Sequence, residues 1–184
     1  MAQQALIVYY SQFNNTTKLA KLIQDATKAS ALRLRVADSV YPNNMEATGR
    51  IYQQQLKQRQ LPILINSMPQ LNQYDVVLVG GPVWNSNVAA PVIEFLKTIQ
   101  GYQGLIAPFS TAWSDSDDYQ ANFIKWAGRL QVTDGFHVTT HGSHQFKANN
   151  LAAWLRKSKN AVADSSKVHD SIFLSLAFST ILVS

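Results

Sequence analysis

Residues 5–20, ALIVYYSQFNNTTKLA, decide the fold. Ala5 to Tyr10 is a continuous apolar, β-branched and aromatic run, which predicts a strand buried on both faces. From Thr16 onward apolar residues recur at helical spacing, and the polar residues 14–17 offer capping side chains just before them. The stretch therefore predicts a central strand, a polar loop and a helix.

The order of strand, loop and helix repeats along the rest of the chain. Further strands are expected at residues 32–36, 75–80, 105–111 and 136–140. Further helices are expected at residues 44–60, 88–99, 119–130 and 151–156. Five strands alternating with helices predict an α/β fold in which helices cover both faces of a parallel sheet. Ligands in such folds bind outside the carboxyl ends of the strands, here the loops after the first, third and fourth strands.

Composition limits the class of protein. With 184 residues, 46% of them hydrophobic and 15% charged, the chain fits one packed domain, expected over residues 1–160 with a tail at 161–184. The chain has no cysteine, which excludes disulfides, thiolate metal ligands and a cysteine nucleophile, so redox chemistry requires a cofactor. The net charge of +5 comes from scattered Lys and Arg residues, and no nucleic-acid partner is expected. Because the first residues lack the pattern of a secretory signal, a cytoplasmic location is expected.

The loop after the first strand predicts an anion-binding site. It precedes a helix, where free backbone N–H groups and the helix dipole favour a phosphate. Its residues are Ser11, Gln12, Phe13, Asn14, Asn15, Thr16 and Thr17. The hydroxyl groups add donors, and asparagine tolerates the left-handed backbone that such a loop often requires. The spacing matches neither a Walker-type loop nor GxGxxG, which argues against nucleoside triphosphates and dinucleotides.

The loops at residues 80–87 and 110–116 each contain a tryptophan. Gly80 and Gly81 allow the backbone to approach a ligand closely. Trp84 and Trp113 would then offer flat apolar faces to a planar ring. The remaining tryptophans, at positions 126 and 154, have helical spacing and are expected in the core.

These stretches resemble the flavodoxin family, in particular its short bacterial flavodoxin-like branch. LIVYYSQFNNTTKLA resembles the FMN-phosphate loop, YDVVLVGGPVW the strand and loop beside the flavin ring, and FSTAWSDS the third flavin loop, while Tyr41-Pro42 recurs after the second strand. The resemblance covers about residues 4–158. It implies a flavodoxin-like three-layer sandwich with a five-stranded parallel sheet of order 2-1-3-4-5, an FMN cofactor and electron transfer.

The resemblance also implies cofactor contacts by position. Around the phosphate it implies Ser11, Phe13, Asn14, Asn15, Thr16 and Thr17. Around the isoalloxazine ring it implies Pro82, Val83, Trp84 and Asn85 on one side and Thr111, Ala112, Trp113, Ser114 and Asp115 on the other. The chain departs from the family pattern where Asn14 replaces a usual glycine, where Asn85 follows Trp84 in place of a second tryptophan, and where Trp113 replaces a small residue.

Three aspartates of the third loop leave two roles open. Asp115, Asp117 and Asp118 either place negative charge near the ring, which disfavours an anionic reduced flavin, or cap the following helix. The histidines that follow, His137, His141 and His144, suggest a metal site. No carboxylate accompanies them at ligand spacing in the sequence, so no metal is expected there.

Several functions remain open at this point. An electron carrier would serve redox partner proteins or a small-molecule acceptor, whereas an FMN-dependent reductase would pass hydride from NADH or NADPH to a quinone-type acceptor. A phosphorylation-responsive receiver domain is disfavoured, because Ser11 and Gly80-Gly81 stand where that class needs acidic residues. A flavin-free interaction module is a further alternative.

The tail after residue 160 resembles nothing in the family. Its apolar run, Ile172–Val183, is about a dozen residues long, which is too short to span a membrane. It could pack on the domain, pair two chains into a homodimer or lie at a membrane surface.

Overall fold

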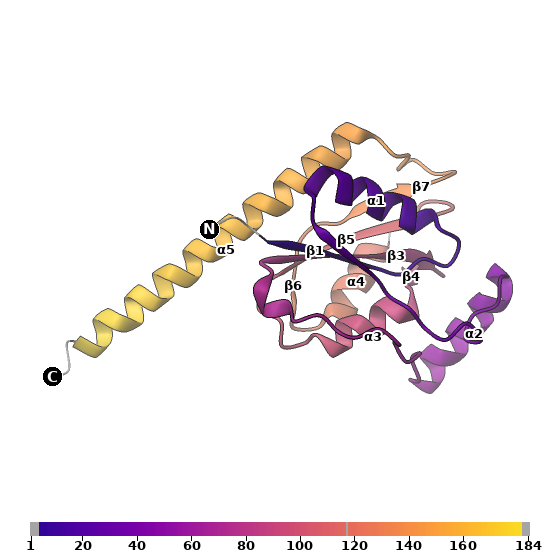
Figure 1. Ribbon diagram of the computed structural model, residues 1–184, viewed down its shortest axis with the longest axis horizontal. Helices are drawn as coiled ribbons and strands as arrows, with labels where there is room; N and C mark the ends of the chain where they lie inside the picture. The colour runs from indigo at the N-terminus through magenta and orange to yellow at the C-terminus, as the bar shows by residue number, and fades with distance from the viewer. Residues whose placement is uncertain (1–3, 117, 182–184) are drawn as a thin grey trace.

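The computed structural model describes residues 4–116 and 118–181, with side chains described up to Asp164. A central sheet lies between two layers of helices (Figure 1). The strands are β1 Ala5–Tyr9, β2 Ser30–Arg33, β3 Val76–Trp84, β4 Asn87–Val88, β5 Leu105–Ala112, β6 Gln131–Val132 and β7 Phe136–Thr139. The α-helices are α1 Asn15–Thr27, α2 Met45–Gln58, α3 Ala90–Thr98, α4 Tyr119–Ala127 and α5 Ala148–Ile181, and a short 3-10 helix covers Leu71–Gln73.

The main sheet is parallel and has the order β2-β1-β3-β5, with β6 and β7 both paired to β5. β6 pairs with the first residues of β5 and β7 with the last ones, so two short strands share the fifth position. The predicted flavodoxin-like order 2-1-3-4-5 is therefore confirmed, with β5 as the fourth strand. A small difference is β4, which pairs antiparallel with the end of β3 as a hairpin.

The two faces of the sheet carry separate hydrophobic cores. On one face α1 and α5 contribute Leu19, Ile23 and Trp154 to a cluster with β1, β3 and β5. On the other face α2, α3 and α4 pack against the sheet, with Tyr52 and Phe123 among the most buried residues. The continuous apolar sequence of β3 follows from this arrangement, because a strand covered on both faces has no exposed side.

The edge of the sheet differs from the prediction. The expected second strand over residues 32–36 is a strand only over Ser30–Arg33, although Leu34 and Val36 are buried in the core. Leu34 N–H still donates to the Tyr9 carbonyl of β1, but a later segment bonds to this part of the chain as well. Ile65 N–H donates to the Arg35 carbonyl, and the Asn66 amide bonds to the backbone of Arg33 and Arg35. This segment covers the edge that would otherwise expose unpaired backbone groups.

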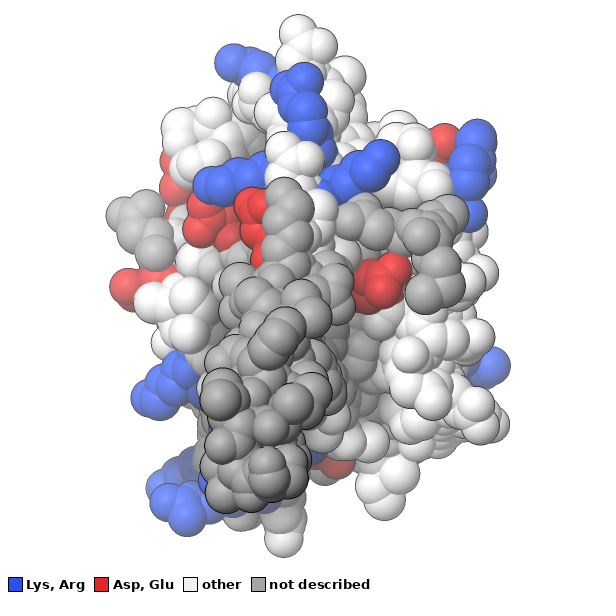
Figure 2. Space-filling view, turned by 90° about the vertical axis from the view of Figure 1, so that its left-hand side faces the viewer, with Lys and Arg blue, Asp and Glu red and all other residues white. Residues whose placement is uncertain are grey.

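Helix α5 runs through the domain boundary predicted at residue 160 without a break, and its second half extends past the sheet (Figure 1). The side chains of residues 165–184 lie outside the described residues, so the roles considered for Ile172–Val183 stay predictions. In the described part of the chain, no helix combines the length and apolarity needed to cross a bilayer. The Lys and Arg side chains in Figure 2 are spread over the face shown, with acidic side chains among them.

Candidate functional site

The three predicted loops meet at one end of the sheet. Register pairs Tyr9 of β1 with Gly80 of β3, and Pro82 of β3 with Thr111 of β5. Since these strands are parallel neighbours, their carboxyl ends deliver Ser11, the residues after Gly81 and the residues after Thr111 to the same edge. This edge lies where the chain order of the strands reverses, which is where such sheets bind ligands.

The first loop has the backbone of an anion cradle. Asn14 adopts the left-handed conformation, with φ 63°, as the N-cap residue of α1, and its side chain makes no capping hydrogen bond. The Asn14 side chain thus caps none of the first N–H groups of α1, which lie at the positive end of the helix dipole. Thr17 N–H donates to the buried Ser11 Oγ at 3.2 Å, which holds the loop closed.

Two threonine hydroxyls at the start of α1 have different roles. The buried Thr16 Oγ1 lies 2.8 Å from Thr111 Oγ1, and this hydrogen bond ties the first loop to the end of β5. Thr17 Oγ1 is a buried atom with no hydrogen-bond partner among the described residues. A buried hydroxyl without a partner is costly, so this atom is suited to donate to a bound anion. Phe13 and Asn15, also predicted at the phosphate, are exposed.

Gln12 has a structural role that the sequence did not reveal. Its Nε2 donates to the Pro42 carbonyl and to Thr48 Oγ1, each at 2.8 Å, which anchors the first loop to the start of α2. The Tyr41-Pro42 pair noted in the sequence thus lies where the first loop contacts the segment before α2.

The second loop is a tight hairpin. β3 continues to Trp84, and the turn residues Asn85 and Ser86 both have positive φ, 49° and 58°. Two consecutive left-handed residues are typical of a two-residue hairpin turn, which accounts for asparagine after Trp84. The turn is fixed to α4, because Asn122 Nδ2 donates to the Ser86 carbonyl and Trp126 Nε1 donates to Asn87 Oδ1.

The predicted role of Trp84 as a platform for a planar ring is wrong in this structure. Its indole is only 2% exposed. It is enclosed by the rings of Tyr10, Tyr41 and Tyr52 at centroid distances of 5.7, 4.9 and 5.5 Å. The extension of β3 through Trp84 turns the side chain into the core. The half-buried Pro82 and Val83 and the exposed turn residue Asn85 remain accessible to a ligand.

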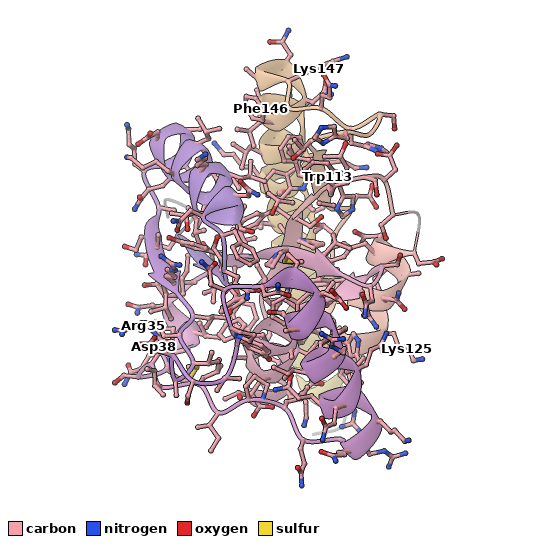
Figure 3. All side chains as sticks on the ribbon, turned by 90° about the vertical axis from the view of Figure 1, so that its right-hand side faces the viewer. Arg35, Asp38, Trp113, Lys125, Phe146 and Lys147 are labelled. Carbon is pink, nitrogen blue, oxygen red and sulfur yellow. The ribbon has the colours of Figure 1, made fainter. Side chains whose placement is uncertain are left out.

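Trp113 is placed differently, since its side chain is 71% exposed. The indole stacks on the His141 ring at 3.7 Å, with an angle of 25° between the planes. Backbone hydrogen bonds from Thr140 to Ala112 and from His141 to Trp113 hold the two segments together. Figure 3 shows Trp113 and Phe146 near each other at the same end of the molecule. The site therefore has one exposed indole rather than two.

Asp115 joins the loops after β5 and β7. Its carboxylate accepts the Ser143 N–H at 2.8 Å and lies 3.0 Å from His144 Nδ1. These hydrogen bonds hold the pKa of Asp115 well below its ordinary range, so the carboxylate stays charged at neutral pH. A Cβ on Gly142 would collide with Asp115, which explains glycine there.

The alternative role of these aspartates as helix caps is not seen for the described residues. The N-cap residue of α4 is Asp118, whose side chain makes no capping bond, and Asp115 bonds to a different loop. Asp117 lies outside the described residues. Ser114 is exposed next to Asp115, and Thr111 and Ala112 are half-buried at the end of β5. The Asp115 charge thus lies two residues after the exposed Trp113 in the chain.

The three histidines have separate partners. Buried Ser110 Oγ and His137 Nδ1 share a hydrogen bond of 2.8 Å, and burial lowers the pKa of His137. His141 stacks on Trp113 and His144 pairs with Asp115. The carboxylate that pairs with His144 lies 29 residues earlier in the chain, outside the sequence spacing that the prediction considered. Within the described residues, no group of three or more His, Cys, Asp or Glu side chains is placed to hold a metal ion.

Two cavities lie at opposite ends of the sheet. The larger, of about 690 Å³, lies at the amino ends of β3 and β5, with Tyr74, Tyr102 and Val162 in its lining, away from the predicted loops. The smaller, of about 340 Å³, borders the first loop and includes Ser11, Gln12, Arg33 and Arg35. Since charged and polar groups gather at the smaller cavity, it is the one connected with the candidate site.

Comparison with known proteins supports the fold. No family model and no curated protein sequence matches this chain. A flavoprotein from Lactobacillus acidophilus, crystallised in complex with FMN, is 27% identical with a TM-score of 0.71, covering 74% of this chain and 93% of that chain. The apo form of the flavoprotein from Lactobacillus acidophilus, solved by NMR, is 27% identical with a TM-score of 0.62, covering 76% and 95%. Two-electron reduced Megasphaera elsdenii flavodoxin is 16% identical with a TM-score of 0.51, covering 84% and 97%.

These structures confirm the resemblance that the sequence indicated. The chain has the flavodoxin-like fold, and its solved structural neighbours include flavoproteins and a flavodoxin.

Proposed function

We propose that this protein binds FMN at the carboxyl end of its sheet and serves as a flavodoxin-like electron carrier. The observation that carries the proposal is the cradle at the start of α1. It combines a left-handed Asn14, whose side chain caps none of the first N–H groups of α1, with the buried Thr17 hydroxyl that has no partner among the described residues. A phosphate monoester fits this donor set, because every group in it donates to an anion. The similarity to a flavoprotein crystallised with FMN supports the same choice of cofactor.

The residues around the cradle divide into phosphate and ring contacts. Ser11 and residues 13–17 would hold the phosphate. Pro82 and Val83 with the backbone of residues 111–115 would line the ring, and the exposed Trp113 would stack on it. When bound, FMN supplies reversible one- and two-electron transfer. The protein then orients the ring through these contacts, while the negative charge of Asp115 opposes further negative charge nearby.

The acceptor is proposed to reach the site from solvent. Trp113 and Phe146 are exposed at this end of the molecule, which supports docking of a redox partner protein or of a small-molecule acceptor. Oxidation of NADH or NADPH by the FMN-loaded protein, with a quinone present, distinguishes a reductase from a carrier. A carrier gives no turnover above free FMN.

The first experiment is an absorbance spectrum of protein that was incubated with FMN and desalted. Flavin bands near 375 and 450 nm, that is about the range expected of an oxidised flavin, are expected to remain with the protein. Thr17→Val should weaken FMN retention, because it removes the unpartnered hydroxyl. Thr98→Val, which removes an exposed hydroxyl at the end of α3, is the matched control. Folded wild-type protein that desalts colourless would contradict the proposal.

A further inference from the structure

Arg33 lies beside the anion cradle although it is 22 residues away from Ser11 in the chain. Parallel register pairs Arg33, the last residue of β2, with Tyr9 of β1. The Leu34 N–H donates to the Tyr9 carbonyl at 2.6 Å, which fixes the carboxyl end of β2 next to the start of the first loop. The backbone of Arg33 is therefore held beside the first loop by the pairing of β2 with β1.

The guanidinium of Arg33 is anchored on this loop. Its Nη2 donates to the Ser11 carbonyl at 2.7 Å, and Ser11 is also the residue whose Oγ holds the Thr17 N–H. A guanidinium has five N–H donors, and the structure records one hydrogen bond for that of Arg33 among the described residues. The anchored group thus keeps donors for a further acceptor, in the planar arrangement that suits a phosphate.

The charge of Arg33 has no carboxylate partner among the described side chains. Residues 11–17 contain no basic residue, and Lys21 of α1 already pairs with Asp25 at 3.0 Å. Burial raises the pKa of Tyr10 to about 12, and the Arg33 charge acts in the opposite direction on the same phenol. Lys18 follows the loop directly, but among the described residues the hydrogen bond from a basic side chain to residues 11–17 is that of Arg33.

The cavity of about 340 Å³ lies between the first loop and the carboxyl end of β2. Arg33 and Arg35 both line it together with Ser11 and Gln12. Arg35 carries the same charge two residues along the chain, but its side chain has no recorded contact with the first loop, and Figure 3 places it at the edge of the molecule near Asp38. Comparing the two arginines therefore distinguishes a charge held against the first loop, that of Arg33, from one that only adds positive charge nearby, that of Arg35.

We propose that the Arg33 guanidinium is the cationic recognition group for the phosphate bound in the first loop. Resting on the proposed function, this makes Arg33 the residue by which the protein prefers FMN over riboflavin, which has the same ring and no phosphate. The rest of the cradle supplies neutral donors and a helix dipole, whereas Arg33 supplies a full charge. Because Arg33 is exposed, we expect its contribution to fall as salt concentration rises.

The test compares the dissociation constants of FMN and riboflavin by quenching of flavin fluorescence. Arg33→Gln keeps a donor for the Ser11 carbonyl and removes the charge, so FMN is expected to bind about tenfold more weakly, while riboflavin is unchanged. Arg33→Lys should recover part of the loss. Arg35→Gln is the matched control and should change neither constant by more than about twofold.

A second measurement needs no flavin. Inorganic phosphate should raise the Tm of the wild-type protein more than chloride of equal ionic strength does, and Arg33→Gln should abolish this difference. If Arg33→Gln weakens the binding of FMN and riboflavin equally, Arg33 only shapes the loop. If Arg33→Gln and Arg35→Gln weaken FMN binding equally, the effect comes from the overall positive charge near the site and not from Arg33 in particular. Either result overturns the inference. If the wild-type protein binds neither flavin, the proposed function fails, and the phosphate measurement alone decides the role of Arg33.

Discussion

Trp84 is the last residue of β3 and Trp113 directly follows the neighbouring parallel strand β5, yet the two have opposite environments. Trp84 is 2% exposed and contacts three tyrosine rings, whereas Trp113 is 71% exposed and contacts one histidine ring. The cause is the backbone that follows each residue. β3 returns immediately as the hairpin strand β4, which packs on α4, but β5 continues into an irregular loop held by residues 140–144.

The contrast shows how similar sequence contexts can have different roles. A large aromatic residue after a buried strand either completes the core or remains available to a ligand, and the next few residues decide between the two. We therefore assign Trp84 to the stability of the fold and propose Trp113 as a contact of the bound ligand. The three predictions below test this division.

The largest effect is expected on stability. Trp84→Ala should lower the free energy of unfolding by about 3–5 kcal/mol, because it leaves a cavity among three tyrosines. Trp113→Ala should change it by less than about 0.5 kcal/mol, since the side chain is mostly exposed. Urea denaturation followed by circular dichroism measures both values.

The control for this comparison is Trp84→Phe. It keeps an aromatic ring and removes Nε1–H, a buried donor without a partner among the described residues, so it should lose less stability than Trp84→Ala. Equal losses for Trp84→Ala and Trp113→Ala would contradict the division.

A smaller effect is expected on flavin affinity. Trp113→Ala should weaken the binding of FMN and of riboflavin alike by about fivefold to tenfold, because stacking concerns the ring that both ligands share. Trp113→Phe should keep most of the affinity. Ile124→Ala, at an exposed apolar residue of α4, is the control and should have no effect. If Trp113→Ala binds both flavins as tightly as wild type, Trp113 is not a ring contact.

The smallest effect concerns the loop that supports Trp113. The native pKa of Asp115 is lowered, so its stabilising contribution is fully present above the ordinary carboxyl pKa of about 4 and is lost as pH falls through the lower native value. Asp115→Asn should therefore lower Tm at pH 7, and the difference from wild type should disappear in acid. A series of thermal melts from neutral to acidic pH measures it.

Asp38→Asn is the control for removing one carboxylate, because Asp38 is exposed at another edge of the molecule, away from the loop of Asp115. A difference between wild type and Asp115→Asn that persists undiminished in acid would show that the hydrogen bonds of Asp115 do not depend on its charge.

Much of the fold was predictable because it depends on local patterns. The buried run Ala5 to Tyr10 and the apolar part of β3 could only be covered strands, and the spacing of Leu19 and Ile23 predicted the face of α1 that packs on them. Strand ends were less predictable, since Leu34 and Val36 are buried like strand residues although the backbone around them pairs with a distant segment. Burial does not by itself specify the hydrogen-bond partner.

The candidate site divides in the same way. Residues 11–17 are close in sequence, so the cradle, including the left-handed backbone tolerated by Asn14, could be predicted from residue types alone. The link of Thr16 to Thr111, the pairing of Asp115 with His144 and the placement of Arg33 on Ser11 join residues 22 to 95 positions apart.

The sequence by itself determined a parallel α/β sheet, and it predicted an anion-binding loop after the first strand, because hydrophobic periodicity and helix capping depend on residues close together in the chain. Only the tertiary structure decided that Trp84 is a core residue, that Trp113 is exposed and that Arg33 reaches the cradle. These outcomes depend on which strands become neighbours and on where each strand ends. Both are fixed by packing between distant segments, for which no local pattern carries a signal.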